Sequence, residues 1–152
     1  MGFTLPQVVL ALALIGLMAA MSIPVIKNAL TAYHLKAAVA AVQGAIQTTR
    51  YQAIMAGCPY TIAFSQTTTT YQVQDEALSG SPPACAASFS NVAGLVPWST
   101  TGDVSLSPST TLQFNPNGTV VATTGSLTFP LTNGVSTETM TVSGVGNVTA
   151  SP

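Results

Sequence analysis

The feature that most constrains the fold is an uncharged apolar run at the N-terminus. It extends from Phe3 to Ile26 and contains no Asp, Glu, Lys or Arg. A transmembrane helix needs about 20 apolar residues, so this run is long enough to cross a bilayer. A secretory signal peptide is the alternative, but it would carry a basic n-region and a shorter apolar core. The run therefore predicts a membrane helix, residues 3–26, that is not removed.

A helical pattern continues beyond this run, but with a single apolar face. The apolar positions recur at the spacings of one side of an α-helix: Leu35, Val39, Val42 and Ile46. Gly57 suits a left-handed cap, and Pro59 cannot continue a helix. Pro24 should bend or weaken the rod, because proline removes a backbone hydrogen bond. We expect residues 27–57 to form the amphipathic half of the same helix.

The remainder of the chain, 58–152, has the pattern of antiparallel strands. Apolar and polar residues alternate with the period of a half-buried strand at 60–64, 71–73, 111–114 and 127–131. Asn-Gly pairs at 117–118 and 133–134 mark turns. Pro130 lacks an N–H, so its strand should lie at an edge or be unpaired on that side. The fold class expected is α+β: a long N-terminal helix packed on an antiparallel β-sheet domain.

The segment 79–109 has several prolines and no clear alternation. Loops of this length are often functional or mobile. Trp98, together with Leu95 and Val96, is interpreted in two ways: as an exposed contact patch, or as a plug in the core. The core position is the preferred interpretation.

Two cysteines, Cys58 and Cys85, follow the apolar run. A single pair in such a chain favours an oxidising compartment and one disulfide, with two separate buried thiols as the alternative. In the chain-entropy model this bridge would stabilise the fold by about 3.6 kcal/mol.

The chain carries three Lys/Arg, four Asp/Glu and one His, for a net charge of −1. Nucleic-acid binding is disfavoured because neutralising phosphates needs clustered Lys and Arg.

His34 is expected in a solvated position, and Asp75 and Glu76 in a loop. As neighbours on a strand, Asp75 and Glu76 would face opposite sides and make a poor acid–base pair, while Asp103 and Glu138 are isolated. We expect that the protein is not an enzyme and that it holds no metal and no cofactor. Weak calcium binding by Asp75, Glu76 and Asp103 is a minor alternative.

The start Gly-Phe-Thr-Leu, the uncharged run and Pro24 resemble the N-terminus of type IV pilins and pseudopilins. In that family a prepilin peptidase cuts after the glycine and methylates the new N-terminal phenylalanine. The resemblance therefore implies processing between Gly2 and Phe3. The family usually has Glu at the fifth mature position, where this chain has Gln7, which can hydrogen-bond an ammonium group but cannot cancel its charge. Residues 1–2 would be only a leader remnant, so either a longer native leader exists or a short one suffices.

Three later segments are similar to the GspH/FimT pseudopilin subfamily: Ala45–Phe64, Thr110–Val121 and Thr139–Ala150. Some members of this subfamily bind DNA through arginines in the closing strand. The matching positions here hold no arginine: Gly146, Asn147, Val148 and Thr149. The resemblance therefore does not bring DNA binding to this chain.

The resemblance implies a structural subunit of a type IV pilus-like filament, held in the inner membrane before assembly and in a periplasmic or extracellular filament afterwards. Its partners would be other pilins, the prepilin peptidase, the inner membrane and the assembly platform with its motor. Gln7, Leu14 and Pro24 are the candidate assembly residues within the apolar helix. The alternatives are a minor GspH-type pseudopilin of a type II secretion system, a DNA-uptake minor pilin, which the lack of basic residues disfavours, and a plain single-span membrane protein.

Overall fold

The computed structural model of the chain describes residues 4–80 and 84–152. Within these ranges it has one helix, α1 (Leu5–Ala56), and twelve strands. The longer strands are β1 (Tyr60–Phe64), β2 (Thr70–Asp75), β8 (Thr110–Phe114), β9 (Val120–Thr124), β10 (Thr128–Thr132), β11 (Thr137–Val142) and β12 (Val148–Ser151). The two-residue strands are β3 (Leu78–Ser79), β4 (Ala84–Cys85), β5 (Ser90–Asn91), β6 (Val96–Pro97) and β7 (Ser105–Leu106). The chain forms two compact units, Met1–Tyr33 and His34–Pro152.

The described part of the first unit is the N-terminal stretch of α1. The helix begins after Thr4, whose backbone N–H donates to Oε1 of Gln7 at 3.2 Å. This bond is one half of a capping box, in which the third helical residue reaches back to the cap. The backbone remains helical through Pro24. Gly2, Phe3 and the side chain of Pro24 lie outside the described residues, so the predictions made for them stay predictions.

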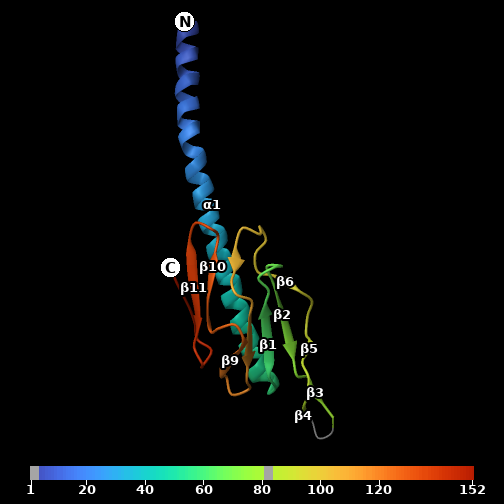
Figure 1. Cartoon of the computed structure of the whole chain (residues 1–152). Helices are drawn as coiled ribbons and strands as arrows, with labels where there is room; N and C mark the ends of the chain where they lie inside the picture. The colour runs from blue at the N-terminus through green and yellow to red at the C-terminus, as the bar shows by residue number, and fades with distance from the viewer. Residues whose placement is uncertain (1–3, 81–83) are drawn as a thin grey trace. The chain divides into compact units, whose positions relative to one another are not determined.

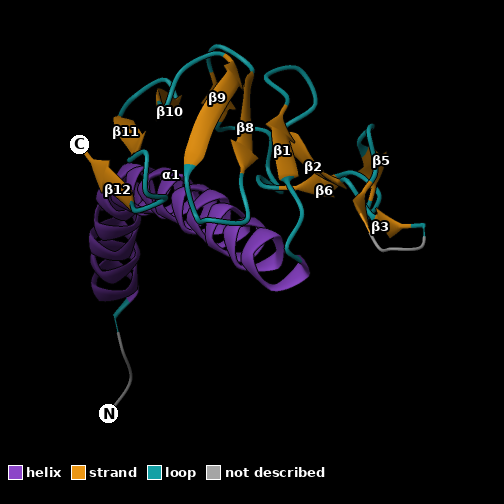
Figure 2. Cartoon of the chain, turned by 90° about the horizontal axis from the view of Figure 1, so that it is seen from below, coloured by secondary structure: helices purple, strands orange, loops and turns teal. Residues whose placement is uncertain are grey.

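In the second unit, the C-terminal part of α1 lies along one side of the strands (Figure 1, Figure 2). All four positions of the predicted apolar face are buried: Leu35, Val39, Val42 and Ile46. They pack against apolar side chains of the sheets: Ile62, Phe64, Leu112, Phe114, Phe129, Leu131, Met140 and Val142. Burying one such side chain stabilises a fold by about 1.5–3 kcal/mol. The α+β fold is therefore confirmed, and the amphipathic spacing is what joins its two layers.

The helix ends where the sequence predicts. Gly57 has φ +68°, a left-handed conformation that is strained for residues with a β-carbon. Its backbone N–H donates to the carbonyl of Ala53 at 3.1 Å. Cys58 follows at once and is joined by a disulfide to Cys85 in β4, with the two Cα atoms 5.6 Å apart. The bridge ties the end of α1 to the short strands.

The strands form two principal antiparallel sheets, where the sequence suggested one. The larger has the order β5-β2-β1-β8-β9, with β6 also pairing with β2, and the smaller has the order β12-β11-β10-β7. In the larger sheet, Ile62 is paired with Val73 on one side and Leu112 on the other. The backbone N–H of Val120 in β9 donates to the carbonyl of Gly144 after β11 at 2.9 Å, which connects the two sheets.

Pro130 lies in an interior strand, because β10 pairs with both β11 and β7. The edge position was therefore wrong, but the second expected arrangement holds. β7 pairs only with Leu131 and Thr132, so within the described residues the β7 side of β10 has no strand partner at Pro130.

The segment 79–109 is irregular but not detached. Two of its short strands, β5 and β6, pair with β2 of the larger sheet, where Val96 lies opposite Tyr71 and Asn91 opposite Gln74. The strand β4 pairs with β3, and β7 pairs with β10 of the smaller sheet. Trp98 is 2% exposed and belongs to the core. The preferred interpretation of Trp98 as a core residue is confirmed.

Candidate functional site

The apolar segment of α1, Leu5–Ile26, is the candidate functional site. Its described large apolar side chains are exposed to solvent, Leu14 by 53% and Met18 by 71%. By length and composition alone, α1 qualifies as a helix that could cross a membrane. Exposed apolar surface on this scale marks a membrane or protein contact. The segment therefore needs lipid or other protein around it.

Of the predicted assembly residues, Gln7 and Leu14 lie on one face of α1, because seven residues make almost two full turns. Gln7 uses its side-chain oxygen on the N–H of Thr4. In this structure, therefore, Gln7 serves the start of its own helix. Leu14 is more than half exposed and presents an apolar side chain.

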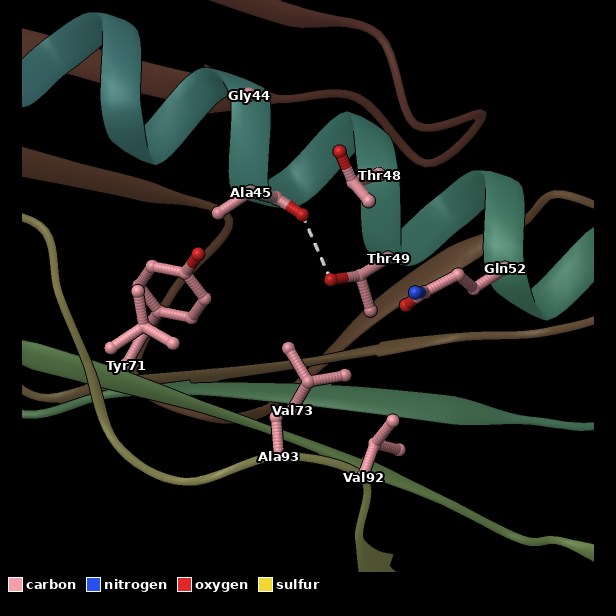
Figure 3. Close-up of a pocket in the computed structure, with 10 residues that line it drawn as sticks. Gly44, Ala45, Thr48, Thr49, Gln52, Tyr71, Val73, Val92 and Ala93 are labelled. Carbon is pink, nitrogen blue, oxygen red and sulfur yellow. Dashed lines mark hydrogen bonds between the residues drawn. The ribbon is translucent and has the colours of Figure 1, made fainter.

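The second unit has a hollow of about 270 Å³ between α1 and the strand β2 (Figure 3). Its lining is mainly apolar and uncharged: Gly44, Ala45, Thr48, Thr49, Gln52, Tyr71, Val73, Val92, Ala93 and Val96. The hydroxyl of Thr49 donates to the carbonyl of Ala45 at 2.8 Å within the helix, so its proton serves the helix rather than a base. Catalysis needs converging acid, base or nucleophilic groups, and this lining does not supply them.

Among the described residues, two pairs of titratable side chains interact: His34 with Asp103, and Tyr60 with Asp75. His34 is only 25% exposed and its Nδ1 lies 3.5 Å from Oδ2 of Asp103, so the expectation of a solvated His34 was wrong. Asp75 ends β2 rather than lying in a loop, and it accepts a hydrogen bond from Ser90 at 3.1 Å. Among the described residues, no three His, Cys, Asp or Glu side chains gather as metal ligands would.

Tyr60 is paired directly opposite Asp75 between β1 and β2. Burial raises the pKa of Tyr60 above the usual 10.0, and the charge of the Asp75 carboxylate and a hydrogen bond to it raise the pKa further. The phenol is therefore held in its neutral form, which suits a structural hydrogen bond and not general-base chemistry.

Arg50 is a residue whose surroundings the sequence analysis missed. Its side chain lies between the β8–β9 turn at Gly118 and the β11–β12 turn at Gly146. Its Nε is buried without a hydrogen-bond partner. The two glycine-containing turns were visible in the sequence, but nothing in it shows that both meet the same arginine.

Comparison with models of known families gives a match for residues 38–146 to the family described as Type II transport protein GspH. The matched range begins in the amphipathic part of α1 and ends in the turn after β11. It covers most of the second unit and none of the apolar segment. No curated protein and no solved structure gave a match to the chain.

Proposed function

The chain belongs to the GspH family of type II transport proteins, and from this membership we propose that it is a pseudopilin, a structural subunit of a type II secretion filament. The observation that carries the proposal is the combination of two parts in one chain. The second unit matches the family, and the first is an apolar helix whose described large apolar side chains are exposed. A secretion filament needs both: a globular part at its surface and an apolar stem at its axis.

The apolar segment Leu5–Ile26, which we call the stem, is surrounded by a different environment before and after assembly. Before assembly, lipid covers Leu5–Ile26 and holds the subunit in the inner membrane. In the filament, the same side chains pack against the stems of neighbouring subunits. Lipid tails are as apolar as leucine, so moving a helix from lipid to protein has no hydrophobic driving force. Assembly therefore depends on close packing between stems and on work done by a motor.

The proposed partners follow from this route. A prepilin peptidase would cut after Gly2 and methylate Phe3, and the assembly platform would then add the subunit to other pilin-like subunits. The globular unit would face the periplasm, where the Cys58–Cys85 disulfide persists because that compartment is oxidising. The role is structural and uses no cofactor.

A subunit of an extracellular type IV pilus is the second candidate, favoured by the charge-poor surface of the second unit, which is rich in Ser and Thr. The DNA-uptake role is the weakest, because all three Lys/Arg residues lie on α1 rather than on the strands. Stoichiometry in sheared filaments separates the first two candidates. A trace component alongside other pseudopilins supports the secretion role, and a dominant band supports the pilus.

The proposal is tested by mass spectrometry of the mature chain and by secretion assays. We expect an N-terminal N-methyl-phenylalanine at Phe3 and loss of type II secretion when the chain is deleted. Leu14→Lys should prevent membrane retention or assembly, because a charge at the centre of a membrane helix is costly. An intact Met1, or normal secretion in the deletion strain, would contradict the proposal.

A further inference from the structure

Arg50 is a half-buried cation with no anion of its own. Among the described residues it has no ion pair and no hydrogen bond, and its Nε is buried and unsatisfied. An unpaired cation held partly out of water is unfavourable. Such an arrangement points to a partner outside the unit.

Two turns hold the inner part of the Arg50 side chain, its Cδ and Nε atoms, in place. A β-carbon on Gly146 would lie 2.5 Å from Cδ and 2.6 Å from Nε of Arg50, and one on Gly118 would lie 3.6 Å from Nη2. Each turn is closed by its own backbone hydrogen bond, Gly118 N–H to Asn115 and Gly146 N–H to Ser143. The guanidinium is therefore mounted on a rigid base, and ordering it for a partner costs little entropy.

Only the outer end of the guanidinium is left for a partner. Nε is buried, whereas the residue as a whole is partly exposed, so the accessible donors are the two terminal nitrogens. These form a planar fork that matches the two oxygens of a carboxylate. A nucleic acid does not fit, because it needs several phosphate contacts and the second unit has only one other Lys or Arg, Lys36.

We propose that Arg50 is the docking point for an Asp or Glu side chain of the adjacent subunit in the filament. The inference rests on the proposed function and deepens it, because it names the chemistry by which neighbouring globular units recognise each other. Charge complementarity supports this occupant. The second unit offers a single rigid cation on a surface with few other charges, so a neighbour's carboxylate would find one matching position. Such a pair sets orientation as much as it adds affinity.

The test compares three variants of the full chain in cells that assemble filaments: Arg50→Gln, Arg50→Lys and, as control, Lys36→Gln. Lys36 is an exposed cation of the same helix. The measurement is the fraction of the chain recovered in sheared filaments, with an oxidised Cys58–Cys85 bridge as evidence of folding. Arg50→Gln should lower this fraction by at least about tenfold, because removing one side of a charge pair leaves the other charge without its partner.

Arg50→Lys should give an intermediate loss, since lysine keeps the charge but not the fork, and Lys36→Gln should behave as wild type. If Arg50→Gln fails to fold, Arg50→Lys and a photo-crosslinker at Gln47, one turn before Arg50, provide the test. The crosslinked peptide of the neighbour should contain Asp or Glu. Wild-type incorporation of Arg50→Gln, or a crosslinked peptide without an acidic residue, would overturn this inference alone. A wild-type chain absent from filaments would overturn the proposed function as well.

Discussion

The side chain of Arg50 and the backbone of Gly146 are in such close contact that no β-carbon fits between them. The two residues lie at opposite ends of the second unit's sequence, one on α1 and the other in the β11–β12 turn. Their contact joins the β11–β12 turn of the smaller sheet to the helix. It also makes the size of residue 146 a sensitive probe of the packing.

Gly146→Ala should destabilise the second unit more than Gly134→Ala does. Both glycines have positive φ, +75° and +81°, so both substitutions carry the left-handed penalty of about 1–2 kcal/mol. Only at Gly146 does the new β-carbon also meet Arg50 and, at 3.2 Å, Val120. Overpacking adds typically about 1–3 kcal/mol. Urea denaturation in detergent, followed by the fluorescence of Trp98, measures the difference, and equal losses for the two variants would refute this packing.

Trp98→Ala should cost about 3–5 kcal/mol of unfolding free energy, as for other large core side chains. The matched variant is Leu95→Ala, three residues earlier and 62% exposed, which should change stability by less than about 0.5 kcal/mol. Protease resistance in increasing urea compares the two without relying on fluorescence. Similar midpoints for both variants would show that Trp98 is not a core residue in solution.

The pairing of Tyr60 with Asp75 predicts a loss of stability at alkaline pH. A raised pKa means that the folded state holds the phenol proton more tightly than the unfolded state does. The stability this provides is complete below the ordinary pKa of about 10 and is lost as the pH rises through the folded value. Asp75→Asn should lower the pKa of Tyr60, because only burial then raises it. Difference absorbance of phenolate against Tyr60→Phe measures this, and identical titrations of wild type and Asp75→Asn would exclude the pair.

Much of the fold follows from local sequence. The spacing of Leu35, Val39, Val42 and Ile46 predicts the buried face of α1, because neighbouring turns of a helix place these residues on one side. The alternation of apolar and polar residues in β1 and β8 predicts strands, because successive side chains of a strand point to opposite faces of the sheet. The turn at 115–118 connects β8 to β9 as expected. It is closed by a hydrogen bond from the backbone N–H of Gly118 to the carbonyl of Asn115.

What the sequence did not predict depends on contacts between distant residues. The two-residue strands within 79–109 have no periodicity of their own and exist because other strands offer them an edge: β2 for β5 and β6, and β10 for β7. The pairs His34–Asp103 and Arg50–Gly146 are likewise made by the tertiary fold. The apolar segment was recognisable from composition alone, because length and lack of charge are sufficient to identify it. Its role in assembly came from the resemblance and not from its pattern.

The central claim is that one apolar stem is covered by lipid before assembly and by neighbouring stems afterwards. Labelling with a membrane-impermeant maleimide tests it most directly, using Leu14→Cys as the reporter and Val135→Cys as the exposed control. Val135 lies in a turn of the second unit and is 87% exposed, and the native cysteines are bonded to each other, so they do not react. The account predicts that the cysteine at position 14 is protected both in membranes and in sheared filaments, while the cysteine at position 135 is labelled in both. Rapid labelling at position 14 in intact membranes or in assembled filaments would contradict it.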